Sequence, residues 1–448
     1  MREKMRLRAI GAVLAAGLLA SVSAPPAMAA EASPVTAVSA FEDVPADSWC
    51  AGAVAYVHSR GLMKGVAAET FAPDRTLTRA MFVTVFARLA GVRTENYGDS
   101  GFTDVKSGSW CSGAISWAEK YGIVSGRTAA VFGTNRAVTR EQAAAMISRA
   151  LDGFRRKLPE TGDAPAFADM ETVSAFAGTG VEQMRKTGIL RGDANGNFRP
   201  KELLTRGQAA SVFMRISQMV EAVTAEADRN ARLLTAANAP CTVKERVLLC
   251  DFRNDIRYPE ISGLVSAEHQ QAWNTVFLKN AEAEKKALSE EGCEVADTFT
   301  VTQADAGLLS VIEDCYTYMD GGMHGTSARF SWNFDMATGK QVKLSDRCDT
   351  DAIAKAVVSG RGYDILTAWG ESAESNGLSL DEILLMSGCE KTRPAVKAML
   401  DRFDSRDPMQ TGGYAYWADG RPCLVLSVSH AAGDFCVIRM DAACARNT

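Results

Sequence analysis

The chain has 448 residues and a formal net charge of −5; 47% of its residues are hydrophobic, 23% are charged and 11 are cysteine. At roughly 150 residues per domain, this length predicts about three domains, and the composition excludes a wholly disordered chain. The acidic balance argues against a broad nucleic-acid-binding surface. A chain of this length with 11 cysteines is also no small disulfide-dense scaffold.

Residues 1–29 have the pattern of a secretory signal peptide. Basic residues from Arg2 to Arg8 precede an apolar stretch, Ala9 to Val22, that is too short for a comfortable membrane span. Ala27-Met28-Ala29 then supplies small residues at the spacing that signal peptidase requires. We expect cleavage after Ala29 and export. No membrane span is expected in the remaining chain, because no later stretch reaches about 18 uninterrupted apolar residues.

The first half contains three similar segments, at residues 41–92, 101–153 and 166–220. Each has an F-x-D motif, an aromatic residue, a G-x-x-x-G motif, a second aromatic residue at a turn, and a Thr-Arg pair. The pairs are 61 and 66 residues apart and are Thr78-Arg79, Thr139-Arg140 and Thr205-Arg206. Five landmarks in the same order three times make a chance match untenable, so we interpret the segments as repeats.

Each repeat is predicted to fold as two helices joined by a loop. The paired glycines are expected to end the first helix, and Thr78, Thr139 and Thr205 to cap the second. Two short helices cannot bury a core alone, so the repeats must pack against one another.

These landmarks resemble the S-layer homology (SLH) repeat, which typically occurs in threes. The resemblance covers residues 41–220. It implies an all-α, pseudo-threefold helical bundle that holds exported bacterial proteins non-covalently on pyruvylated secondary cell-wall polysaccharide. It also implies ligand-binding grooves between repeats, lined by the early aspartates and by the arginines of the Thr-Arg pairs. The candidate binding residues are Asp43, Arg79, Asp104, Arg140, Asp169 and Arg206.

The chemistry of such a groove is reasonable, since a pyruvyl ketal carries a carboxylate and a guanidinium at a helix N-terminus can bind it with two donors. The alternative is that each arginine forms a salt bridge to a neighbouring repeat. Only Arg140 is followed by glutamate, and the third repeat has Phe176 where the others have tryptophan and Met170 where valine is usual. We therefore expect the groove of the third repeat to be the weakest.

Cysteines allow two interpretations. Cys50 and Cys111 occupy equivalent positions in the first two repeats, which is compatible with a disulfide or with two small buried residues. Nine further cysteines lie between Cys241 and Cys444. Their connectivity cannot be deduced, and one is left over from pairing within this half. None has zinc-knuckle spacing, so no metal site is predicted.

Residues 221–240 are polar and alanine-rich and are predicted to be a linker or linking helix. From residue 241 to 448 the pattern changes to strand-like alternation between about 299 and 334 and in 414–417, 423–428 and 435–438. Helices are predicted around 266–287, 350–358, 379–387 and 394–403. The second half is thus expected to be an α+β domain with an antiparallel sheet.

Three stretches of this half, 258–264, 316–325 and 333–346, include the motifs G-G-x-H-G and N-F-D-x-x-T-G-K. They resemble the extracytoplasmic domain of RsiV-type anti-sigma factors, which sense lysozyme. The same module precedes some wall-polysaccharide deacetylases. The resemblance implies a ligand-binding domain for lysozyme or for another extracellular protein or glycan. Sigma-factor control is not expected, because no cytoplasmic segment is apparent.

An enzymatic role has little support in the sequence. His324, in the glycine-rich loop, is the one attractive general base, and it could equally pack within a tight turn. No cofactor-binding or common hydrolase motif is present. We therefore expect a secreted protein held at the cell wall that displays a ligand-binding domain. The alternatives are a wall-glycan hydrolase or deacetylase and a structural S-layer subunit.

Overall fold

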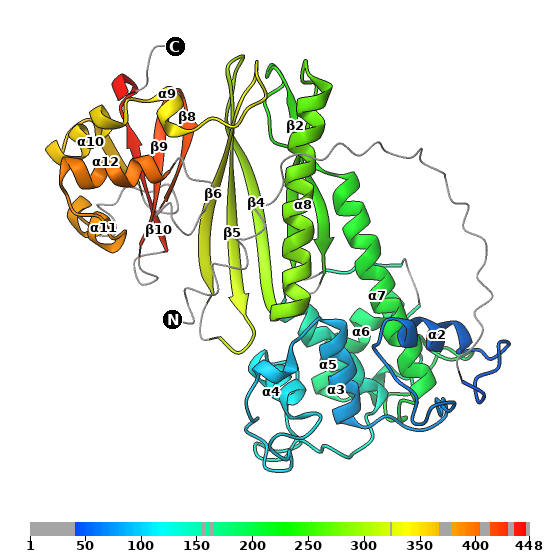
Figure 1. Cartoon of the computed structure of the whole chain (residues 1–448). Helices are drawn as coiled ribbons and strands as arrows, with labels where there is room; N and C mark the ends of the chain where they lie inside the picture. Colours follow the sequence, from blue (N-terminus) through cyan, green and yellow to red (C-terminus); the bar gives the residue numbers. More distant parts are fainter. Residues whose placement is uncertain are drawn as a thin grey trace. The chain divides into compact units, whose positions relative to one another are not determined.

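The computed structural model describes residues 41–154, 157–161, 165–251, 253–322, 325–366, 378–403, 413–428 and 434–444. These residues fall into two compact units (Figure 1). The repeat unit contains the residues up to Glu226 and also Cys250–Arg253. The sheet unit contains Ala227–Leu249 and the residues from Asn254 onward. No helix in these ranges is long and apolar enough to cross a membrane.

The repeat unit is built from helices, as the repeats predict. Its elements are α2 (Ala51–Ser59), α3 (Arg79–Leu89), η1 (Thr94–Asn96), α4 (Ser112–Lys120), α5 (Arg140–Gly153), η2 (Met170–Thr172), η3 (Ala175–Ala177), α6 (Gly178–Thr187) and α7 (Arg206–Arg229). The three predicted caps are confirmed: Thr78, Thr139 and Thr205 accept the N–H of the third residue of α3, α5 and α7. Residues 221–229 of the predicted linker continue helix α7.

The three repeats share one hydrophobic core, which is why none of them needs a core of its own. Phe82 of the first repeat packs on Phe213 of the third, with ring centroids 5.2 Å apart, and Phe86 lies 6.2 Å from Trp117 of the second. Isolated backbone bridges connect the loops before the second helices. They join Thr76 to Thr205, Thr78 to Ala137 and Thr139 to Leu203, so every repeat is bridged to both others.

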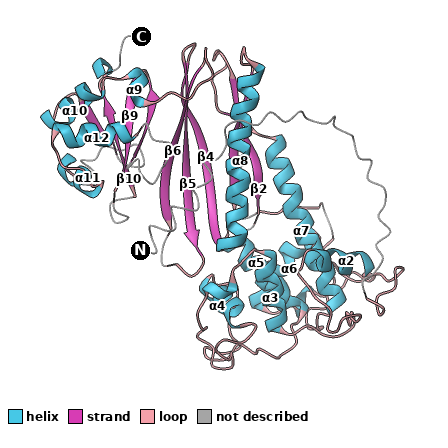
Figure 2. Ribbon diagram, viewed as in Figure 1, coloured by secondary structure: helices cyan, strands magenta, loops and turns pink. Residues whose placement is uncertain are grey.

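The sheet unit begins with a six-stranded sheet in the order β1-β2-β3-β4-β5-β6. The strands are β1 (Arg232–Leu233), β2 (Thr242–Cys250), β3 (Asp255–Ser262), β4 (Cys293–Ala304), β5 (Leu308–Met319) and β6 (Thr326–Asp335). Helix α8 (Ala267–Glu291) connects β3 to β4 and packs along both (Figure 2). Strands β3 and β4 are parallel. The expected antiparallel sheet is therefore mixed, because a helical crossover returns the chain in the same direction.

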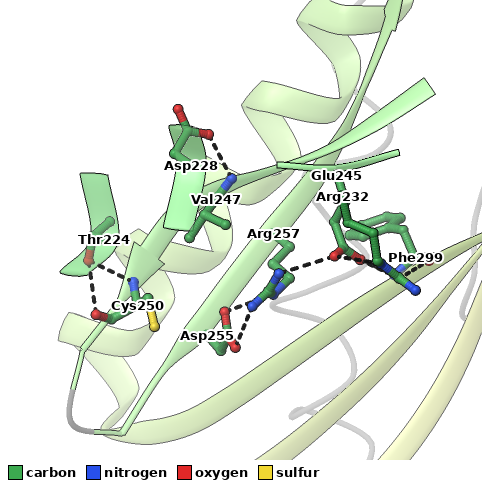
Figure 3. A network of polar contacts seen from close by, with 9 residues as sticks. All are labelled: Thr224, Asp228, Arg232, Glu245, Val247, Cys250, Asp255, Arg257 and Phe299. Atoms are coloured by element: carbon green, nitrogen blue, oxygen red, sulfur yellow. Dashed lines mark hydrogen bonds and ion pairs between the residues drawn. The ribbon is translucent and has the colours of Figure 1, made fainter. Parts of the chain in front are cut away.

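A buried carboxylate fixes the β1 side of this sheet (Figure 3). Glu245 on β2 is 2% exposed, and its Oε1 accepts hydrogen bonds from Arg232 at 3.0 Å and from the backbone N–H of Phe299 at 3.0 Å. Its Oε2 accepts from Arg257 at 3.1 Å, and Arg257 also pairs with Asp255. Burial opposes ionisation of Glu245, but these donors hold its pKa below the ordinary value.

A second, antiparallel sheet has the order β7-β10-β9-β8, formed by β7 (Tyr363–Leu366), β8 (Gly413–Ala418), β9 (Arg421–Ser427) and β10 (Phe435–Met440). Helices α9 (Leu344–Arg347), α10 (Thr350–Ser359), α11 (Leu380–Met386) and α12 (Arg393–Arg402) and the turn η6 (Ala442–Cys444) complete the unit. Asn333 of β6 donates to Ala415 O of β8 at 2.8 Å, so hydrogen bonds link the two sheets. The four predicted helices and the three late strands are confirmed to within a few residues.

Candidate functional site

The arginines of the three Thr-Arg pairs hold the repeats together. Arg79, Arg140 and Arg206 are 5%, 9% and 7% exposed. Each Nε donates to the carbonyl of an aromatic residue in another repeat. The distances are 3.1 Å from Arg79 to Phe132, 2.7 Å from Arg140 to Phe198 and 2.7 Å from Arg206 to Phe71. The first repeat thus binds the second, the second binds the third, and the third binds the first.

A second donor strengthens each of these links. The Nη2 groups donate to Ser125 O at 2.9 Å, Arg191 O at 2.7 Å and Lys64 O at 2.7 Å, in the same order of arginines. Each guanidinium carbon also lies 4.5–4.8 Å from the ring centroid of its aromatic partner. The contacts that these arginines make between repeats therefore go to carbonyl oxygens and rings, whereas the sequence suggested salt bridges as the alternative to ligand binding. The second and third repeats are also joined by an ion pair at a different residue, between Glu141 and Lys201 at 2.8 Å.

Burial lowers the pKa of these arginines but leaves them protonated. Loss of solvation lowers the pKa of all three, that of Arg79 to about 10. They remain cationic at neutral pH. Among the described residues, the Nη1 groups of Arg140 and Arg206 make no hydrogen bond, so each can still donate to a ligand.

The three candidate aspartates act within their own repeats. Each carboxylate accepts backbone N–H groups from the turn at the second aromatic residue: Asp43 from Phe71 and Ala72, Asp104 from Phe132 and Gly133, and Asp169 from Phe198 and Arg199, at 2.6–2.8 Å. The turn residues that follow the aromatics have positive φ, at 58°, 85° and 56°. The same phenylalanine thus donates to an aspartate and accepts from an arginine, which brings the predicted Asp and Arg candidates together.

Three exposed aromatic residues were not predicted as site residues. In the sequence they served only as landmarks that define the repeats. Trp49, Trp110 and Phe176 lie two residues before the start of α2, α4 and α6 and are 65%, 62% and 53% exposed. A single exposed apolar side chain is ordinary, but here an aromatic ring stands at the same position in all three repeats. Their recurrence ahead of each first helix was the signal available in the sequence.

One groove, the Arg140 groove, combines side chains of all three repeats. Its cavity of about 320 Å³ is lined by Trp49 of the first repeat, Arg140 of the second, and residues of the third that include Arg191 and Arg215. Arg215 donates to Ile189 O at 2.9 Å. Burial, and then the charges of Arg191 and Arg140, lower the pKa of Arg215. Four arginines and two acids line this groove; Arg199 pairs with both acids, Asp193 and Glu202, and the other three guanidinium groups favour an anion.

A second groove, the Arg206 groove, has the same plan and is smaller, at about 140 Å³. It is lined by Trp110 of the second repeat, Arg206 of the third, and Lys64 and Arg88 of the first. Arg88 is equivalent to Arg215, and its Nη1 donates to Leu62 O at 3.1 Å. Lysine thus replaces Arg191 here.

The third set of equivalent residues is Phe176, Arg79, Ser125 and Arg149. It carries a phenylalanine in place of tryptophan and a serine in place of Arg191. Arg149 Nη1 lies 3.3 Å from Ser125 Oγ. This position therefore lacks a counterpart of Arg191, although the charge of Arg127 also acts on Arg79 here.

The suggested disulfide between Cys50 and Cys111 is not formed in the structure. Both are free thiols, 0% and 2% exposed, at the N-caps of α2 and α4. Cys50 Sγ packs against Gly207 of the third repeat, where an added Cβ would lie 3.3 Å away, so its sulfur fills space between repeats. The alternative interpretation, two small buried residues, describes these positions. His324 and its neighbour Met323 lie outside the described residues.

Comparison with known proteins identifies the repeats. The S-layer homology domain matches residues 40–81, 101–144 and 166–210. The chain therefore carries three SLH repeats, as the landmarks predicted.

The chain is 33% identical over 173 residues to an amylopullulanase of Thermoanaerobacterium thermosulfurigenes, which covers 39% of the chain and 9% of that protein. It is 28% identical over 339 residues to the surface-layer 125 kDa protein of Lysinibacillus sphaericus, covering 73% of the chain and 25% of that protein. The chain thus spans about a quarter or less of the length of these curated relatives. A DUF3298 family crystal structure from Pseudomonas aeruginosa aligns with 47% of the chain and 95% of its own, at 11% identity and a TM-score of 0.28.

The SLH repeats and the similarity to surface-layer proteins agree with the location predicted from the sequence. The protein is secreted and associated with the cell wall.

Proposed function

We propose that the repeat unit attaches the protein to an acidic cell-wall polysaccharide, and that the sheet unit is displayed there to bind an extracellular ligand. Following the SLH resemblance, the wall ligand is pyruvylated secondary cell-wall polysaccharide, and the repeats form a pseudo-threefold bundle. Following the RsiV resemblance, lysozyme is the first candidate ligand of the sheet unit, and another extracellular protein or glycan is the second.

The observation that carries the wall-binding proposal is the meeting of Arg140, Arg191 and Arg215 beside the exposed ring of Trp49 in one groove. A ketal carboxylate can accept paired hydrogen bonds from a guanidinium, and the apolar face of a sugar ring can pack on an indole. The charge is local to the groove, so binding does not require a basic protein. The Arg140 groove is proposed to bind most tightly, followed by the Arg206 groove.

Sedimentation with purified cell walls tests this assignment. Trp49→Ala and Arg191→Gln should each weaken wall binding by about 10-fold, since a lost packing or charge-assisted contact costs about 1.5 kcal/mol. Lys106→Gln is the matched control, because it removes one positive charge from an exposed residue outside the groove lining. Wild-type binding by both groove variants would refute the assignment.

The proposed ligand of the sheet unit needs a separate experiment. The whole chain, bound to walls, is mixed with lysozyme, and retention of lysozyme is compared with retention by walls alone. Added retention together with inhibition of lysozyme activity is expected. Absence of both would reject lysozyme and leave the wall-binding assignment unaffected.

A second candidate function is a structural surface-layer subunit. It is favoured by the similarity to the Lysinibacillus surface-layer protein, which extends over 73% of the chain and so beyond the repeats. A subunit of this kind should form ordered lattices on purified walls, visible by electron microscopy, whereas a displayed binding protein should decorate the walls without a lattice.

A further inference from the structure

A buried cluster of acids and a thiol lies between helix α8 and the six-stranded sheet. Asp297 on β4 and Cys315 on β5 are direct partners across the two strands, so their side chains share one face of the sheet. Glu284 reaches the pair from α8, and the ligand atoms of all three residues lie within 4.8 Å of one another. The cluster is separate from the grooves of the repeat unit.

The buried carboxyl group of Asp297 lacks a stabilising donor. It is 1% exposed, and among the described residues no backbone N–H and no cationic side chain donates to Oδ1 or Oδ2; the groups that face it are the Glu284 carboxyl and the Cys315 thiol, which can share a proton with it. Glu245, a buried acid of the same sheet, shows the contrast, because two arginines and a backbone N–H satisfy it. A buried carboxyl group without partners is costly, so a counter-charge or proton is needed at Asp297.

The surroundings of the cluster are also acidic, since a third carboxyl group, Glu313, acts on it. Burial, followed by the charges of Glu284 and Glu313, raises the pKa of Asp297 well above its ordinary value. Burial, followed by Asp297, Glu284 and Glu313, likewise raises the pKa of the Cys315 thiol. Burial raises the pKa of Glu313 to about 8, although Trp332 donates to its Oε2 at 3.3 Å. Without a cation the cluster therefore holds protons, and a divalent ion that binds here would displace them.

The spacing of the donors fits a small divalent cation. Cys315 Sγ lies 3.7 Å from Glu284 Oε1. A tetrahedral zinc site with a sulfur bond of about 2.3 Å and an oxygen bond of about 2.1 Å places those two atoms about 3.6 Å apart. One thiolate and two carboxylates suit zinc by donor type, and Glu284, which is only partly buried, leaves a side from which an ion can enter. We propose that Glu284, Asp297 and Cys315 bind Zn²⁺, with water as the fourth ligand.

Such a site would fasten α8 to β4 and β5. The residues come from positions that packing alone would fill with apolar side chains: Asp297 alternates with Val295 and Phe299 on β4, and Glu284 follows Phe277 and Ala281 on the buried stripe of α8. Binding would displace the Cys315 thiol proton and any carboxyl proton to solvent, so zinc affinity should fall in acid.

The proposal is tested on the whole chain, with thiols reduced and metals removed by a chelator. Zn²⁺ should bind at one equivalent per chain and slow amide hydrogen exchange in 293–319. Co²⁺ should give a sulfur-to-metal charge-transfer absorption band. Cys315→Ser should abolish the band, and Asp297→Asn and Glu284→Gln should each weaken Zn²⁺ binding by about 10-fold or more.

Matched controls separate this site from general effects. Cys436→Ser changes another buried thiol in the sheet unit, and Glu282→Gln changes an exposed acid on α8; both should bind Zn²⁺ as the wild type does. Without metal, the Asp297→Asn variant should be at least as stable as the wild type. Weaker Zn²⁺ binding by this variant then cannot be attributed to misfolding. A wild-type chain that binds no Zn²⁺, or a Cys315→Ser variant that keeps the cobalt band, would overturn the proposal. The buried acids and the thiol would then be stabilised by protons shared between them.

Discussion

Arg140 should be required for folding as well as for binding, and substitution by methionine tests both roles. Arg140→Met keeps an unbranched aliphatic chain of similar length and removes the guanidinium that donates to Phe198 O and Arg191 O. The first of these bonds is buried, and leaving a buried carbonyl unsatisfied costs about 1–3 kcal/mol. With the second bond and the ring contact, we expect the repeat unit to lose about 2–4 kcal/mol of unfolding free energy.

The assay is hydrogen exchange in urea, followed by mass spectrometry of peptides from 41–226, so that the repeat unit is measured apart from the sheet unit. Arg191→Gln is the comparison, because its side chain lines the same groove and does not link repeats; its unfolding free energy should change by less than about 0.5 kcal/mol. Wall binding should be weakened in both variants. Wild-type stability of Arg140→Met would refute the view that this arginine holds the second and third repeats together.

Three further predictions concern other parts of the chain. Gly133→Ala should destabilise the repeat unit by about 1–2 kcal/mol in the same exchange assay, because φ is 85° at this residue and an added Cβ would contact the Arg127 side chain. An unchanged unfolding free energy would contradict this turn geometry. Trp110→Ala should weaken wall sedimentation less than Trp49→Ala, since the Arg206 groove is smaller, and the reverse order would contradict the proposed ranking. In the metal-free chain, the stability of the sheet unit should fall as pH rises from about 4.5 toward 8, because the raised pKa of Glu313 keeps its proton bound in the folded state after the unfolded state has released it. Urea titrations at several pH values measure this slope, and Glu313→Gln should flatten it. An unaltered slope in the variant would contradict the buried environment of Glu313.

Local sequence signals predicted the elements of both units well. Threonine caps and glycine ends located the repeat helices, and alternation located β4 to β6 and β8 to β10, because these features depend on residues a few positions apart. The parallel pairing of β3 with β4 was not predicted, since it depends on the path of α8 across the sheet.

The roles of the candidate site residues depended on distant contacts. Arg79, Arg140 and Arg206 bind carbonyls 53, 58 and 135 residues away, so their structural role emerges only when the repeats close on one another. The resemblance named these arginines as ligand candidates; it did not indicate that they join the repeats or that the aspartates hold turns. Asp297 and Glu284 were overlooked as well, although an acid inside an apolar alternation is a readable signal.

Wall binding before and after selective removal of pyruvyl groups tests the central claim most directly. Purified walls are treated with mild acid to hydrolyse the ketals, and the whole chain is sedimented with treated and untreated walls. The account predicts strong binding to untreated walls, loss of binding to treated walls, and weakened binding of Arg191→Gln to untreated walls alone. Equal binding of the wild-type chain to both preparations would contradict recognition of an acidic glycan by the arginine grooves.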